Sequence, residues 1–195
     1  SYLAFLVLAT QIAAIGALLD QPILIIGAMV LGPEFGPVAA ICCAVMQRDL
    51  RLMGGAARAL VVGFAVAIVF TLVCASVSRL LGWISPGMLD DRPLTDFIVH
   101  PDRWSFIVAV LAGVAGILSM TAGKSAALVG VFISVTTVPA AGNIAVAIAL
   151  AHGNEVRASF VQLGVNLIGM IIAGILTLLF QRVLWARFGL SPAPP

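Results

Sequence analysis

The sequence Gly32-Pro33-Glu34-Phe35-Gly36-Pro37 decides how this chain folds. It lies in the middle of an apolar segment, about residues 22 to 47, that is long enough to cross a bilayer. Proline removes a backbone donor and clashes with the preceding helical turn, so the sequence predicts a break in the helix here. A broken helix at this depth is stable only where its freed backbone groups face protein or a water-filled cavity. A carboxylate inside the membrane is a candidate functional group.

The composition is that of an all-α integral membrane protein whose surroundings are a lipid bilayer. Hydrophobic residues make up 62% of the 195 residues, charged residues make up 9%, and the mean hydropathy is +1.19. Soluble domains carry roughly 25% charged residues. No basic patch is interleaved with aromatic residues, so we expect no nucleic-acid partner. There is no initiator Met and no signal peptide with a cleavage site, so we expect a membrane core trimmed from a longer protein.

Six apolar segments predict six transmembrane spans in a single transmembrane domain, residues 1–195. Four spans are unbroken, at about residues 1–19, 52–83, 104–120 and 159–185. The second span is interrupted at 32–37, and the fifth span, about 126–151, is interrupted at 136–143. We therefore divide the chain into repeat one (1–83), an extracellular loop (84–103), repeat two (104–186) and a short tail (187–195).

The two halves show the same order of features. Gly27-Ala28-Met29 aligns with Gly130-Val131-Phe132, and Pro37 aligns with Pro139, at an offset of 102–103 residues. Each half holds three spans, an odd number, so the second half must enter the membrane upside down. Inverted repeats with paired broken helices, here helices 2 and 5, are typical of secondary transporters, whose substrate site lies between the repeats.

The first broken segment also carries a family resemblance. Ile25-Ile26-Gly27-Ala28-Met29, followed by a Gly/Ser-Pro-x-x-Gly-Pro break, resembles the bacterial domain-of-unknown-function 389 proteins. The second half is similar too, in the stretch 125–131 and in Asn166-Leu167. The resemblance implies a hydrophobic membrane core, often preceded by a separate cytoplasmic domain, and implies no established function. The chain departs from the commoner pattern at Glu34, where a small or apolar residue usually stands, so the family lends Glu34 no general role.

The charge distribution predicts an orientation. The side that holds both termini collects six basic residues and one acid, whereas the opposite side collects four basic residues and six acids. The positive-inside rule therefore places both termini in the cytoplasm. Together with the resemblance, this predicts a multi-pass protein of the bacterial inner (plasma) membrane.

The candidate site lies between the two predicted breaks. Glu34 is a proton carrier, a cation ligand or a substrate contact, or else a protonated carboxyl or a carboxylate satisfied by freed backbone donors at the break. The polar groups of the second break either bind a solute or cap the half-helices. Asn166 shares one face of the last helix with Gln162, where both form interhelical hydrogen bonds or contribute to the site. The predicted substrate- or ion-binding residues are Gly32, Pro33, Glu34, Gly36, Pro37, Thr136, Thr137, Pro139, Asn143 and Asn166.

The sequence favours a transporter or channel-like permease for a small solute or ion. The alternative is a non-transporting membrane anchor or signalling module for an associated cytoplasmic domain. We expect no enzyme, because both histidines lie in loops and Ser134 has no evident base. We expect no cofactor and no metal, because no ligand spacing joins the three cysteines to the histidines. The many small residues suit close helix packing, which makes a homo-oligomer plausible.

Overall fold

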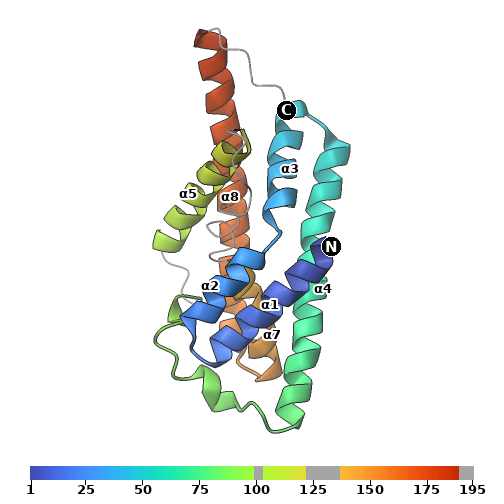
Figure 1. Ribbon diagram of the computed structural model, residues 1–195, viewed down its shortest axis with the longest axis vertical. Helices are drawn as coiled ribbons and strands as arrows, with labels where there is room; N and C mark the ends of the chain where they lie inside the picture. Colours follow the sequence, from blue (N-terminus) through green and yellow to red (C-terminus); the bar gives the residue numbers. More distant parts are fainter. Residues whose placement is uncertain (99–102, 122–136, 189–195) are drawn as a thin grey trace.

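The computed structural model describes residues 1–98, 103–121 and 137–188, and this part of the chain is helical, without strands (Figure 1). The helices are α1 (Tyr2–Leu18), α2 (Pro22–Leu31), α3 (Phe35–Gln47), α4 (Leu50–Leu80), α5 (Arg103–Thr121), α7 (Thr137–Ala149) and α8 (Gly153–Phe188), with 3-10 turns η1 (Pro86–Leu89) and η2 (Asp96–Ile98).

Two helices, α4 and α8, are long and apolar enough to cross a membrane. The pair α2 and α3 passes the same test as a third span bent by 50°. The other apolar helical segments found in the described chain are shorter, at 10–17 residues: Tyr2–Leu18, Phe106–Thr121 and Thr137–Ala149. A membrane protein with two or three candidate spans follows from these lengths, and six spans stay a prediction.

The break in the second span is confirmed, but it is shorter than predicted. It comprises Gly32, Pro33 and Glu34, between α2 and α3. Gly32 is extended, at φ −63° and ψ 117°, because a following proline disfavours the helical conformation of the residue before it. Gly36 and Pro37 were expected in the break, yet both lie in the first turn of α3. Proline is tolerated there because the first helical N–H groups have no partner within the helix.

The predicted interruption of the fifth span is wrong for every residue of it that the structure describes. The segment from Thr137 to Asn143 is helical and belongs to α7. Pro139 lies near the first described residue of α7, as Pro37 lies near the start of α3. A proline in this place does not interrupt a helix. Thr136 lies outside the described residues.

The two long helices form the frame of the molecule (Figure 1). Helix α4 packs against α1, α3 and α7, and α8 packs against α3, α5 and α7. Glycines allow close approach between helices: a Cβ on Gly142 of α7 would lie 2.8 Å from the backbone nitrogen of Ala14 in α1. Such contacts between small residues are typical of packing in membrane helices.

The connections α3–α4 and α7–α8 have the same backbone geometry. Arg48 and Ala151, 103 positions apart, both adopt a left-handed conformation, with φ of 56° and 65°. The next residues, Asp49 and His152, donate their N–H groups five residues back, to Ala44 at 2.9 Å and to Ala147 at 2.8 Å. Each connection therefore closes its helix in the same way, at the same offset along the chain.

Three connections meet at one end of the molecule: the α1–α2 turn, the α7–α8 turn and the segment between α4 and α5. Asp20, in the α1–α2 turn, accepts hydrogen bonds from the backbone N–H and the hydroxyl of Thr95, both at 2.8 Å. His152, in the α7–α8 turn, lies 3.1 Å from the Asp90 carboxylate. The segment between α4 and α5 is therefore fastened to the ends of α1, α2, α7 and α8.

Candidate functional site

A buried hydrogen bond joins the first break to the second half of the chain. The Thr137 hydroxyl donates to Oε1 of Glu34 at 2.6 Å, and both side chains are fully buried. Glu34 stands at the N-terminal end of α3, because Pro33 ends the preceding helix at that point. Figure 1 shows α2 and α3 meeting about half-way along the long axis of the molecule. The carboxyl group is thus held deep inside the protein by a residue from the opposite half.

Asn166 and Gln162 lie close to the level of this bond. The amide of Asn143 in α7 donates to the Ser159 hydroxyl in α8 at 2.9 Å, which fixes the register of these two antiparallel helices. Thr137 is six residues before Asn143, and Val165, the neighbour of Asn166, is six residues after Ser159. At 1.5 Å per residue, both positions lie roughly 9 Å from the fixed pair. The structure therefore places Asn166 at the depth of the Glu34 carboxyl.

The two carboxamides of α8 are unusual for buried groups. Asn166 is 0% exposed and Gln162 is 1% exposed. Neither the nitrogen nor the oxygen of either amide has a hydrogen-bond partner among the described residues. Buried polar side-chain atoms are normally satisfied, and leaving one unpaired costs about 1–3 kcal/mol. The expected interhelical hydrogen bonds are absent from this part of the structure, and four polar atoms are left for another partner.

Asn143 forms hydrogen bonds with charged residues of two other segments. Its Oδ1 accepts a 2.7 Å hydrogen bond from Arg92, whose second nitrogen lies 2.5 Å from Glu155. The Asn143 amide also donates to Glu155 at 3.2 Å. Arg92 is 4% exposed, so this network fastens the segment after α4 onto α7 and α8. Among the described residues, Asn143 thus joins Arg92, Glu155 and Ser159, and its role in binding stays a prediction.

The remaining predicted site residues fall into two groups. Gly32 and Pro139 are buried, and Pro33 and Pro37 are half-buried. Gly36 is exposed on the surface of α3, and a Cβ built there would meet nothing within 4 Å. Gly36 thus lies apart from the buried groups, and the prolines shape the helix ends without presenting a polar side chain.

Sequence reasoning missed Arg92, Glu155 and Ser159. Arg92 lies in a polar loop with several other charged residues, and no local pattern marks it as buried. Its partners, Asn143 on α7 and Glu155 on α8, lie 51 and 63 positions further along the chain. A charged residue that becomes buried only through such a contact leaves no signal in its own neighbourhood.

Comparison with known proteins agrees with the membrane core described above. The sequence profile of a family described as a domain of unknown function, DUF389, matches residues 29–172. The chain belongs to the DUF389 family. This domain is 29% identical over 187 residues to an uncharacterized protein of Methanocaldococcus jannaschii. The match covers 96% of this chain and 54% of that relative, so the chain spans about half the length of the curated protein it matches.

The family match covers both parts of the candidate site. It includes Glu34, Thr137 and Asn166, and it ends within α8. No solved structure matches this DUF389 chain. Neither the family description nor that of the archaeal relative names a substrate, so only the residues of the site indicate its chemistry.

Proposed function

We propose that this chain is the membrane core of a transporter or channel-like permease for a small solute or ion. The observation that carries the proposal is the buried Glu34–Thr137 hydrogen bond at a helix break. A carboxyl group in the middle of a membrane costs roughly 2.5–3.5 kcal/mol on insertion scales, and a helix break costs backbone hydrogen bonds as well. Paired together, these features are characteristic of pathways for solutes and ions.

The helix contacts support an inverted repeat. In the proposed repeat, α1, α3 and α4 correspond to α5, α7 and α8. The pairs α1–α4 and α3–α4 then correspond to α5–α8 and α7–α8, and all four pairs are in contact. The crossed pair α4–α7 corresponds to α8–α3, and both are in contact. The halves differ in one respect, because α1 packs along α7 whereas α5 touches α3 only slightly.

The position of the Glu34–Thr137 bond supports the same symmetry. Its residues are 103 positions apart, which is also the offset between the two equivalent connections. A two-fold axis brings equivalent residues of its two halves together where it passes through them. The bond therefore marks where the proposed axis runs, and inverted-repeat transporters hold their substrates at that place.

The buried amides indicate what the site can hold. Carboxamides supply both donors and acceptors, whereas Glu34 supplies a carboxyl group. Together with the Thr137 hydroxyl, these groups can bind a polar solute, and their oxygen atoms can hold a cation or relay a proton. A strongly hydrophobic substrate would leave the amides unpaired, and the proposal excludes it.

The experiment is flux through purified protein in proteoliposomes. Uptake of monovalent cations, protons and small neutral solutes is measured with and without a pH gradient. We expect flux of one of these classes, and Glu34→Gln should abolish its pH dependence without changing the folded fraction. Asp91→Asn is the matched control, because Asp91 is an exposed acid of the loop segment. Equal pH dependence in Glu34→Gln and wild type would contradict the role of Glu34.

The alternative function is an anchor or signalling module. It is favoured by the length of the archaeal relative, of which the matched part is 54%. Absence of flux across ions and common solutes, with the protein correctly folded in liposomes, would support that module.

The proposal includes the setting of the protein. The chain lies in a plasma membrane with both termini in the cytoplasm, as its basic residues predict. The large apolar side chains exposed along α4, including Val61, Val69 and Phe70, face lipid or a second copy in a homo-oligomer. Cysteine accessibility at each terminus in oriented vesicles tests the orientation, and cross-linking in the membrane tests the oligomer.

A further inference from the structure

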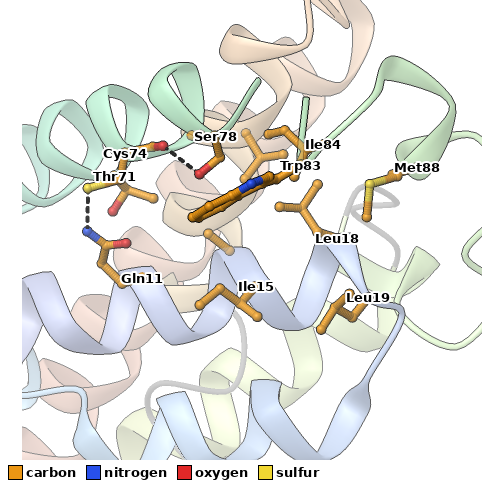
Figure 2. Close-up of a pocket in the computed structure, with 13 residues that line it drawn as sticks. Gln11, Ile15, Leu18, Leu19, Thr71, Cys74, Ser78, Trp83, Ile84 and Met88 are labelled. Carbon is orange, nitrogen blue, oxygen red and sulfur yellow. Dashed lines mark hydrogen bonds between the residues drawn. The ribbon is translucent and has the colours of Figure 1, made fainter. Parts of the chain in front are cut away.

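A second cavity lies between α1 and α4, away from the Glu34 site. It has a volume of about 310 Å³, and Trp83, Ile84 and Met88 from the segment that follows α4 contribute to its lining (Figure 2). Thirteen residues line it, and none of them is Glu34, Thr137, Gln162 or Asn166. This volume is at the lower end of the range for small-molecule pockets.

The cavity has a polar wall in its interior. Gln11 on α1 and Thr71, Cys74 and Ser78 on α4 line it, together with apolar side chains. Figure 2 shows the Gln11 amide bonded to the Cys74 sulfur, at 3.2 Å, and the Ser78 hydroxyl bonded to the Cys74 carbonyl, at 2.9 Å. No charged residue is among the described residues that line the cavity.

Thr71 is the group that these contacts leave unsatisfied. Its side chain is 2% exposed, and its hydroxyl has no hydrogen-bond partner among the described residues. Buried threonines in helices usually bond the carbonyl four residues back, as Thr10 does to Leu6 at 2.7 Å and Thr177 does to Ala173 at 2.8 Å. Thr71 lacks this bond and lines the cavity instead, so its hydroxyl is available to a bound molecule.

The order of groups along the cavity sets the orientation of that molecule. Thr71 lies nine residues before the end of α4, and Gln11 lies seven residues before the end of α1, so these groups are roughly 14 Å and 10 Å inside the helix ends. Leu18, Leu19 and Trp83 line the cavity near these helix ends. A membrane lipid would need the reverse order, with its polar end near the helix ends and its acyl chain beside Thr71 and Gln11.

We infer that this cavity binds a small uncharged molecule with a hydrogen-bonding group at one end and an apolar body. The polar end lies inward, between Thr71 and Gln11, and the apolar body contacts Leu18 and Trp83. A charged ligand is disfavoured because no counter-charge lines the cavity. The inference concerns binding only and stands whether or not the chain transports a solute.

Cys74 provides a probe inside the cavity. The test uses a variant with Cys42→Ala and Cys43→Ala, in which Cys74 is the single cysteine, and measures its rate of reaction with N-ethylmaleimide. Benzyl alcohol, which has a hydroxyl and an apolar ring, should slow this reaction. Toluene has no hydroxyl and benzoate is charged, so both should protect Cys74 much less than benzyl alcohol does.

Thr71→Val tests the polar end, because it removes the hydroxyl and keeps the shape. It should raise the concentration of benzyl alcohol that gives half-protection by roughly three- to tenfold, as expected for one lost hydrogen bond. Thr10→Val is the matched control and should leave protection unchanged, because Thr10 bonds its own helix. A second control keeps Cys43 as the single cysteine. Cys43 lies on α3 outside the cavity, so benzyl alcohol should not protect it.

Three outcomes would overturn the inference. Equal protection by toluene and benzyl alcohol would show an apolar crevice filled by lipid or detergent. No protection by any probe would show a cavity that holds water alone. Equal protection of Cys74 in wild-type and Thr71→Val backgrounds, with both proteins folded by circular dichroism, would show that the hydroxyl is not a ligand.

Discussion

Glu34 and Thr137 stand 103 positions apart in the sequence, and a 2.6 Å hydrogen bond joins their side chains inside the protein. The acceptor is the residue at which one broken helix resumes, and the donor belongs to α7 in the second half of the chain. The bond connects a carboxyl group at a helix break in one half of the chain to a threonine within a helix of the other half.

Thr137→Val should destabilise the protein, because it removes a donor from a fully buried carboxyl group. A hydrogen bond contributes a net of about 0.5–1.5 kcal/mol to stability, so we expect a loss of that size in the free energy of unfolding, measured in mixed micelles. Thr137→Ser keeps the hydroxyl and should recover most of the loss. Thr10→Val is the control, since its hydroxyl bonds a carbonyl of its own helix. Equal effects of Thr137→Val and Thr10→Val would show that the Glu34 bond contributes nothing.

Gly142→Ala should weaken the packing of α1 on α7. The added Cβ would lie 2.8 Å from the Ala14 backbone nitrogen and 3.0 Å from the Thr10 carbonyl oxygen, and backbone atoms cannot move aside. Overpacking typically costs about 1–3 kcal/mol. Thermal unfolding in detergent measures the effect. Gly54→Ala in α4 is the matched control, because its Cβ would meet nothing within 4 Å, and alanine favours helix by roughly 0.5–1 kcal/mol.

Arg92→Lys should loosen the segment that follows α4, although it keeps the charge. The arginine fork reaches two partners at once, Asn143 through one nitrogen and Glu155 through the other. Lysine presents a single ammonium group and cannot reproduce both bonds. We expect faster proteolysis within residues 84–98 and faster amide hydrogen exchange there. Arg157→Lys, at an exposed position of α8, should change neither rate. Unchanged proteolysis in Arg92→Lys would mean that the network does not fasten this segment.

Asp49→Ala should lower stability through the start of α4. The Asp49 carboxylate caps this helix by accepting hydrogen bonds from the N–H groups of Arg51 at 2.9 Å and Leu52 at 3.0 Å. Loss of an N-terminal cap costs about 0.5–2 kcal/mol. Unfolding in mixed micelles gives the value, and Asp49→Asn should retain most of the cap. A neutral result for Asp49→Ala would show that water caps the helix equally well.

The sequence by itself determined the helices and the first break. The apolar composition indicates a membrane protein. Helix ends follow from local residues such as Asp49, which caps the start of α4. Pro33 ends the helix wherever its neighbours lie, since its effect acts on the residue before it. The predicted breaks were too long. Gly36, Pro37 and Pro139 were expected to interrupt helices, yet they lie in α3 and α7, because a proline in the first turn is compatible with a helix.

The tertiary structure alone decided which polar residues meet. Thr137 and Asn143 are six residues apart on one helix, but the first contacts Glu34 and the second contacts Arg92. The amides of Asn166 and Gln162 and the Thr71 hydroxyl have no hydrogen-bond partner among the described residues, and this too depends on how neighbouring helices pack. Local propensity acts through adjacent residues, so most helix ends can be predicted from nearby residues. Partners more than 50 positions away are chosen by packing, and a single sequence carries no local trace of that choice.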